Sequence, residues 1–175
     1  MEEAQKFSDY YDAGFKGISA FKEKGSNFVR THGYVLMCEK TGHKMYWQDF
    51  KKWREIEDIP YWERKQTLSA DELREHQMAG AKWDRLSLNA VTQGSGIIIL
   101  KIAITAFFKW IIKNNYFNII KICDLVHDEA CIEYPEQLKD LVVPKLTGCM
   151  EKAASLICTK LPIPAEAETG KFWIH

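Results

Sequence analysis

Two short groups of residues have side chains and spacings that could do chemistry. The first is His127, Asp128 and Glu129, which are adjacent and separate two apolar segments. Paired carboxylates supply the hard oxygen ligands that Mg²⁺ prefers. Because successive side chains of a strand point to opposite faces, only one of the two acids can coordinate directly from a regular strand, while the other would act through water or from a distorted turn. A solvated polar turn has the same three residues, so the tripeptide alone leaves both interpretations open.

The second group is Arg85, Asn89 and Gln93, spaced at i, i+4 and i+8. This spacing places all three side chains on one face of a helix. The resulting row of hydrogen-bond donors can reach purine N3 and pyrimidine O2, the acceptors that every base pair presents in the DNA minor groove. An ordinary polar helix face has the same spacing, so this alternative also stays open at this point.

The elements that must position these residues follow from apolar spacing and from turn residues. Gly25 is a candidate end for the first helix, Pro60 should stop the third element, and Ser69 with Glu72 has the pattern of a capping box. Pro144 should kink or split the last helix. The expected elements, in chain order, are a helix over 7–30, a hairpin over 33–47, a helix over 49–59, helical segments over 70–88 and 97–113 with a glycine-containing interruption at 94–96, strands over 117–126 and 130–134, a helix over 136–158 and an extended tail over 161–175.

These elements predict a helix-rich α+β fold with antiparallel β-hairpins. The length of 175 residues fits one domain, and a hydrophobic fraction of 46% argues against wholesale disorder. The 24 basic residues balance the 24 acidic ones, which excludes a globally basic footprint for nucleic acid and leaves local patches.

Composition also bears on the compartment. Five cysteines without a C-x-x-C pair predict free thiols in a reducing compartment, and the N-terminus has no pattern of a secretory signal. The apolar stretch Ile97–Ile112 carries Lys101 and Lys109, so it predicts a buried helix and no membrane span.

Taken together and in order, these residues resemble the C-terminal part of family A DNA polymerases. The pattern Arg85-x-x-x-Asn89-x-x-x-Gln93-Gly94 with Lys101-x-Ala103 looks like the segment after the fingers, and Leu125–Ala130 looks like the motif C hairpin. The ending Gly170–His175 is similar to the family's Gly-x-x-Trp ending with its terminal His. Upstream, residues 11–21 and 33–42 resemble the helix and hairpin that precede the Arg/Asn/Gln helix, so the resemblance covers nearly the whole chain.

The resemblance implies template-directed nucleotidyl transfer to a primer 3′-hydroxyl in DNA replication, with two Mg²⁺ ions as cofactor. Asp128 and Glu129 would be the catalytic and metal-binding acids, Asp128 as one of the two carboxylates that hold the ions and Glu129 as a supporting one. His127 would touch the primer terminus. The implied partners are primer–template DNA and dNTPs.

The same resemblance implies a DNA-binding role for Arg85, Asn89 and Gln93 along the minor groove at the primer–template junction. Within a single polymerase domain over 1–175, residues 1–68 would form a helix, a hairpin and a connecting helix. Residues 69–116 would form the minor-groove-tracking helices, and 117–175 the motif C hairpin, a helix and a C-terminal strand.

The sequence also departs from the family pattern at several positions. The family's first catalytic Asp and its fingers helix lie upstream of these motifs, and neither pattern occurs in the 175 residues. Ile97 and Ile98 stand where a small residue and an acid are usual, and His43-Lys44 replaces a pair of arginines. The chain is therefore expected to be a partial palm subdomain, of phage or bacterial type. Without a second polypeptide that carries the rest, we expect it to be inactive.

Two further expectations accompany this one. The location would be the bacterial cytoplasm or that of a phage-infected host, with no membrane as partner. The alternative function is a non-catalytic DNA-binding or partner-binding remnant of such a polymerase. A small Mg²⁺-dependent hydrolase has less support, because no further acid cluster completes a site around Asp128 and Glu129.

Overall fold

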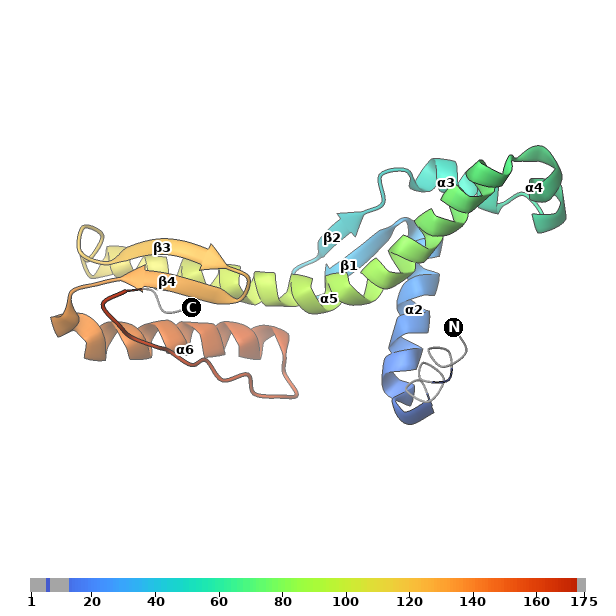
Figure 1. Ribbon diagram of the computed structural model, residues 1–175. Coiled ribbons are helices and arrows are strands. Elements are labelled where there is room, and N and C mark those ends of the chain that lie inside the picture. The colour runs from blue at the N-terminus through green and yellow to red at the C-terminus, as the bar shows by residue number, and fades with distance from the viewer. Residues whose placement is uncertain (1–5, 7–12, 173–175) are drawn as a thin grey trace. The chain divides into compact units, whose positions relative to one another are not determined.

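The computed structural model describes residue 6 and residues 13–172, which form two compact units over 1–92 and 93–175 (Figure 1). The first unit contains α2 (Lys16–His32), the strands β1 (Tyr34–Cys38) and β2 (His43–Tyr46), α3 (Phe50–Glu57), α4 (Tyr61–Thr67) and the first part of the long helix α5 (Ala70–Lys113). The second contains the rest of α5, β3 (Lys121–Val126), β4 (Glu129–Glu133), the short 3₁₀ helix η1 (Glu136–Leu138) and α6 (Lys139–Ile157). In the described residues the strands form two antiparallel two-stranded sheets, which confirms the helix-rich α+β class.

The first helix differs from its predicted form. α2 begins at Lys16 and runs through Gly25 to His32, so Gly25 does not end it. Gly25 lies against α5 instead: a Cβ added there would stand 3.1 Å from the hydroxyl of Ser87. Phe7, Tyr11, Phe15, Ile18 and Phe21 have the spacing of one apolar helix face, which predicts burial. Phe15, Ile18 and Phe21 are nevertheless 53%, 38% and 42% exposed. Phe7 and Tyr11 lie outside the described residues.

The core of the first unit is aromatic. The ring of Trp47 lies between those of Trp53 and Trp83, with centroid distances of 4.6 and 5.2 Å. Val29 from α2 and Val35 from β1 complete the buried set. The partly buried hydrophobic residues packed around it are Met45, Phe50, Ala79, Trp83, Ala90 and Val91. Every element of this unit except α4 therefore contributes to one core, which joins the β1–β2 hairpin to α5.

Gly33 makes the tight turn between α2 and β1 possible. It ends α2 with a left-handed backbone, φ 72°, and its N–H donates to the carbonyl of Val29 at 2.8 Å. A Cβ at this position would overlap the ring of Phe50. Both the backbone conformation and the lack of space therefore demand glycine.

The capping box is confirmed at the start of α5. The backbone N–H and the hydroxyl of Ser69 both donate to the Glu72 carboxylate, at 2.9 and 2.7 Å, and the Glu72 N–H donates to the Ser69 hydroxyl at 3.2 Å. These bonds, the backbone one first, hold the pKa of Glu72 below its ordinary value. Pro60 stops α3 as predicted, but a further short helix, α4, follows directly after it. Proline is well tolerated at the start of a helix, so it separates two helices here.

The expected interruption of α5 at 94–96 does not occur. The helix is continuous over 44 residues. A glycine inside a helix costs only about 1 kcal/mol relative to alanine. Ile98, Leu100 and Ala103, each at most 7% exposed, follow the glycines directly, so burial of this apolar face offsets the cost of the glycines.

One helix of the described chain, α5, is long and apolar enough to pass the length and composition test for a membrane span. The core helix of a compact unit passes the same test. In α5 the side chains of Phe107 and Ile111 are 0% and 1% exposed inside a protein core. Only 28% of the apolar window is buried, however, and Ile97, Phe108 and Ile112 are 45%, 40% and 52% exposed. The predicted burial is therefore confirmed for one face of this stretch.

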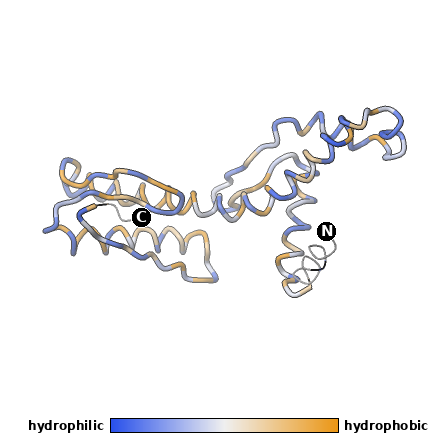
Figure 2. The backbone as a smooth tube through the Cα atoms, viewed as in Figure 1, coloured by the Kyte–Doolittle hydropathy of each residue, from blue (hydrophilic) through white to orange (hydrophobic). Residues whose placement is uncertain are grey.

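The second unit buries its core between α5, the β3–β4 hairpin and α6. Its fully enclosed residues are Phe107, Ile111, Ile120, Val142 and Cys149. Ile122 of β3 opposes Ile132 of β4, and both pack against this core. In the tube drawing, hydrophobic positions recur along α6 and along the part of α5 that lies behind the hairpin (Figure 2). The predicted strand over 117–126 is shorter than expected, since β3 begins at Lys121.

α6 agrees with the prediction in extent but not in every detail. It is preceded by one 3₁₀ turn and continues past Pro144 without being split. The apolar spacing of this segment predicts a buried stripe made of Leu138, Leu141, Val142, Leu146, Met150, Ala153 and Ile157. The buried positions are Val142, Cys149, Ala153 and Ala154, whereas Leu141 is 43% exposed. The predicted face is therefore confirmed at Leu138, Val142, Leu146 and Ala153, which are buried or packed on the core, and is wrong at Leu141.

The predicted C-terminal strand is not present over 158–172, where the chain after α6 has neither helix nor strand. The Ala165 N–H donates to the Glu151 carboxylate at 3.3 Å. The last three residues, which include Trp173 and His175 of the predicted family ending, lie outside the described residues. All five cysteines are free thiols, as predicted.

Two glycines with the same backbone twist but different surroundings provide a test of this turn. Gly33 and Gly42 have φ of 72° and 70°, but no atom lies within 4 Å of a Cβ added at Gly42. Gly42→Ala should cost about 1–2 kcal/mol through backbone strain alone. Gly33→Ala should cost about 2–5 kcal/mol, because the clash with Phe50 adds to the strain. Urea unfolding followed by tryptophan fluorescence measures both, and equal losses would contradict the steric role of Phe50.

Candidate nucleic-acid and metal sites

The first candidate site is the tip of the β3–β4 hairpin. Val126 pairs with Glu129, so His127 and Asp128 form a two-residue turn. His127 has φ 54°, a left-handed conformation at the first turn position, which two-residue hairpins of this kind require. His127, Asp128 and Glu129 are all exposed. The turn therefore projects a carboxylate and an imidazole at the end of a short sheet.

The geometry bears on how these acids could hold a cation. Asp128 lies in the turn and Glu129 at the first position of β4, so they do not occupy successive positions of one regular strand. Over residues 13–172, no group of three or more His, Cys, Asp or Glu side chains is placed to hold a metal ion. Mg²⁺ commonly takes one or two carboxylates and completes its shell with water and substrate phosphates. The two acids fit that partial role, and they do not form a complete cage by themselves.

The second candidate site is the polar face of α5. Arg85, Asn89 and Gln93 are all exposed, and each lies within α5. Arg85 and Asn89 belong to the first unit, and Gln93 is the first residue of the second. The asparagine also borders an apolar groove of about 570 Å³ between α5 and α2, lined by Gly17, Ile18, Phe21, Leu88, Asn89 and Thr92.

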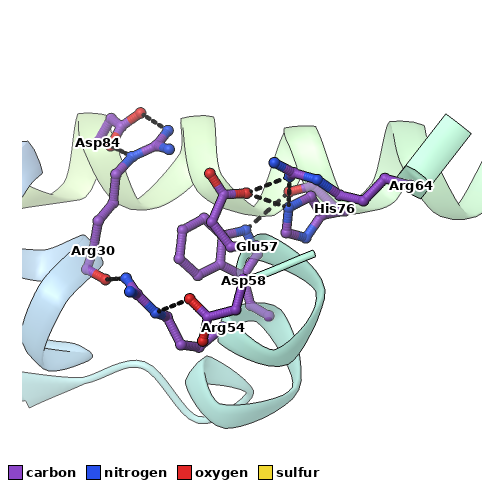
Figure 3. Close-up of polar contacts among 8 residues, drawn as sticks. Arg30, Arg54, Glu57, Asp58, Arg64, His76 and Asp84 are labelled. Atoms are coloured by element: carbon purple, nitrogen blue, oxygen red, sulfur yellow. Dashed lines mark hydrogen bonds and ion pairs between the residues drawn. The ribbon is translucent and has the colours of Figure 1, made fainter. Parts of the chain in front are cut away.

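An ion pair beside Arg85 holds this part of α5 against α2. The Asp84 carboxylate accepts from Arg30 Nε at 2.8 Å and Nη2 at 2.6 Å (Figure 3). It also accepts from the Ser26 hydroxyl. The guanidinium of Arg30 also lies over the Trp53 ring, 5.5 Å from its centroid. Bidentate arginine–carboxylate pairs are directional as well as strong. They therefore fix both the separation and the rotation of α5 at the residue next to Arg85.

The ion pair shifts the pKa of both partners. Burial acts to raise the pKa of Asp84, but the hydrogen bonds from Arg30 and Ser26 and the charge of Arg30 outweigh it and leave the pKa below its ordinary value. The hydrogen bond to Asp84 in turn raises the pKa of Arg30. Both groups are therefore charged across the neutral range.

A second polar cluster joins α3, α4 and α5. The Glu57 carboxylate lies 2.6 Å from Arg64 Nη1 and 2.7 Å from His76 Nε2 (Figure 3). A carboxylate only accepts hydrogen bonds, so Nε2 of His76 donates to Glu57. Arg64 Nη1 lies 3.2 Å from the same Nε2, but both nitrogens are then donors and do not bond to each other. Burial acts to raise the pKa of Glu57, but the bonds from His76 and Arg64 outweigh it and lower the pKa overall.

Sequence reasoning missed both polar clusters. Their members are far apart in the chain: Arg30 and Asp84 are 54 residues apart, and Glu57 and His76 are 19 apart. In the sequence, Glu57 and His76 are one acid and one histidine on two amphipathic helices. That combination is too common in proteins to predict a contact. Such long-range pairs depend on how the helices pack, and a single sequence does not contain that information.

Comparison with known proteins decides the family. A sequence model described as DNA polymerase family A matches residues 1–175, the whole chain. The chain belongs to DNA polymerase family A. Members of this family are DNA-directed DNA polymerases that use Mg²⁺.

Individual relatives agree with the family assignment. Over 98% of its length the chain is 28% identical to DNA polymerase I of Caldicellulosiruptor bescii and 32% identical to DNA polymerase I of Borreliella burgdorferi. It is 22% identical to DNA polymerase I of Aquifex aeolicus over 99% of its length. The chain spans 17%, 16% and 29% of the length of these three relatives. It is thus homologous to one part of a family A polymerase.

The pKa shifts predict how acid affects stability. A carboxyl group whose pKa is lower in the folded than in the unfolded chain binds fewer protons when folded. Its stabilisation is therefore full above the ordinary value of about 4 and is lost as the pH falls through the lowered value. Asp84 and Glu57 are two such groups. We expect the free energy of unfolding to fall as the pH drops below about 4.5.

Asp84→Asn should destabilise the chain by about 1–2 kcal/mol at neutral pH and flatten part of the acid dependence, since the charged bonds to Arg30 are gone. Glu55→Gln, at an exposed position of α3, is the matched control and should change neither quantity. Urea unfolding at a series of pH values measures both variants. An Asp84→Asn variant with the full acid dependence of the unmodified chain would contradict the assignment.

Proposed function

We propose that this chain is a C-terminal palm and fingers-adjacent part of a family A DNA polymerase. It would contribute to template-directed addition of nucleotides to a primer 3′-hydroxyl during DNA replication. The observation that carries the proposal is the family match over all 175 residues, combined with a hairpin that puts Asp128 at a tight turn. The phage or bacterial type, the palm assignment and the cytoplasmic location belong to this proposal.

Asp128 is the acid that we assign to the metal site, with Glu129 in support. A bound Mg²⁺ would supply a Lewis acid and a template for the phosphate oxygens of the reaction. The chain's own part is to hold a carboxylate at the end of β3 and β4, in the two-residue turn between them. Glu129, paired in register with Val126, starts the strand that fixes the turn. His127, beside it at φ 54°, is assigned to the primer terminus.

Arg85, Asn89 and Gln93 are the residues that we assign to the minor groove of primer–template DNA. Three exposed donors on one continuous helix support this role. Their acceptors would be purine N3 and pyrimidine O2, which every correct base pair presents in nearly the same place. Binding of this kind is independent of sequence but sensitive to mispairing.

The DNA contacts can be tested by binding. Arg85→Ala and Gln93→Ala should each weaken binding to a primer–template by about 1–3 kcal/mol, whatever its sequence. Lys51→Ala is the matched control, because it removes an exposed positive charge from α3, away from the proposed face. Fluorescence anisotropy with labelled primer–template DNA measures all three. Equal affinities of the Arg85 and Lys51 variants would count against the minor-groove role.

Catalysis can be tested separately. The two adjacent acids alone hold too little negative charge for a tight pair of Mg²⁺ ions. We therefore expect no dNTP incorporation in a primer-extension assay with the 175-residue polypeptide and Mg²⁺. A second polypeptide that carries the remaining polymerase segments should restore incorporation, and Asp128→Asn should abolish the restored activity. Efficient primer extension by the 175 residues alone would refute the proposal that a second polypeptide must supply the rest of the catalytic site.

The same assay separates the alternative function. A chain that binds primer–template DNA through Arg85 but never supports extension, even with the complementing polypeptide, would fit a non-catalytic DNA-binding remnant.

A further inference from the structure

A cluster of rings lies on the first unit where α2 meets the β1–β2 hairpin. Phe28 and His32, one turn apart on α2, are stacked with centroids 4.2 Å apart. Tyr34 of β1 meets Phe28 edge-on at 5.3 Å, and its cross-strand partner Tyr46 lies 5.8 Å away. The ammonium group of Lys44 stands 4.4 Å from the Tyr34 ring centroid. We name these five residues the aromatic surface.

Three of the five residues of the aromatic surface are exposed to solvent. Tyr46 is 65% exposed although it lies in a strand, and His32 and Lys44 are also exposed. The hydrophobic core of this unit does not include Tyr46, since β2 contributes Met45 to it instead. Packing accounts for half-buried Phe28 and Tyr34, but it does not account for the exposed ring of Tyr46, two residues from Lys44 on β2.

The charge around this surface is positive although the whole chain is neutral. From Lys16 to Tyr46 the sequence has six basic and two acidic residues, with two histidines in addition. Of the six, Arg30 is engaged with Asp84. The remaining charges stand on the exposed sides of α2 and of the hairpin, so this part of the unit has a local excess of positive charge next to open aromatic rings.

Rings and cations side by side are the combination that binds single-stranded nucleic acid, in which bases stack on the rings and phosphates approach the cations. In a duplex the bases are already stacked on one another, so a surface ring gains nothing from them. We infer that the aromatic surface binds single-stranded DNA, with an unpaired base stacked on Tyr46 and a phosphate beside Lys44. The inference rests on the proposed function, because that function makes DNA the ligand.

The test measures the affinity of the full chain for a dye-labelled oligothymidine by fluorescence anisotropy. Tyr46→Ala should weaken binding about tenfold, within the range for the loss of one stacked base. Tyr46→Phe keeps the ring and should bind like the unmodified chain. Lys44→Gln should weaken binding less and make it less dependent on salt, since one phosphate contact is lost.

The chain offers a closely matched control on α4. Tyr61 is 52% exposed and has the ammonium group of Lys65 4.7 Å from its ring centroid. Tyr61→Ala therefore removes an exposed tyrosine with its own lysine but leaves the aromatic surface whole, and it should not change affinity. Equal losses for Tyr46→Ala and Tyr61→Ala, or no binding of oligothymidine at all, would overturn the inference.

Blunt duplex DNA separates this inference from the proposed function. If Arg85→Ala weakens binding to blunt duplex while Tyr46→Ala leaves oligothymidine binding unchanged, the minor-groove role stands and the single-strand role fails. If Tyr46→Ala weakens oligothymidine binding while Arg85→Ala has no effect on duplex, the reverse holds. Sedimentation of the Tyr46 variant is measured alongside: a change in self-association without a change in DNA affinity would mean that the surface contacts protein, which also overturns the inference.

Discussion

The Asp84 carboxylate is the interaction on which the arrangement of the first unit depends. It accepts three hydrogen bonds from two residues of α2, one turn apart, and it stands next to Arg85 on α5. Apolar packing between Val29, Trp47, Trp53 and Trp83 supplies the larger part of the stabilisation, but apolar contacts are not directional. The ion pair specifies which face of α5 turns toward α2. The face that carries Arg85 and Asn89 is thereby left exposed.

The hairpin tip of the second unit depends on a different constraint, the register of a short sheet. Ile122 and Ile132 oppose each other and pack on the core, and a shift of one residue would turn both outward. The pairing of Val126 with Glu129 then leaves two residues for the turn. This turn requires a left-handed backbone at His127, which is unfavourable for a residue other than glycine. It places Asp128 at the end of the sheet. In both units, therefore, buried apolar residues determine where exposed polar ones stand.

Local features were predictable where short-range physics decides them. The capping box of Ser69 and Glu72, the β1–β2 hairpin and the β3–β4 hairpin all depend on residues within a few positions of one another. Predictions failed where a local preference competes with burial. Gly25 and the glycines at 94–96 weaken a helix, but contact with Ser87 and burial of Ile98 and Leu100 keep α2 and α5 continuous. The spacing predicts both Leu141 and Val142 in the buried stripe of α6, but only Val142 is buried.

The amino-acid sequence by itself determined the family, the helix-rich α+β class and the identity of the exposed residues proposed for chemistry, because motifs and periodicity are local properties of the chain. Only the tertiary structure decided which carboxylates are paired, with Asp84 bonded to α2 and Glu57 to Arg64 and His76, and which rings share a surface beside Lys44. The physical reason is that ion pairs and ring contacts act over a few ångströms between residues tens of positions apart. Their existence depends on the packing of whole helices and not on any single segment.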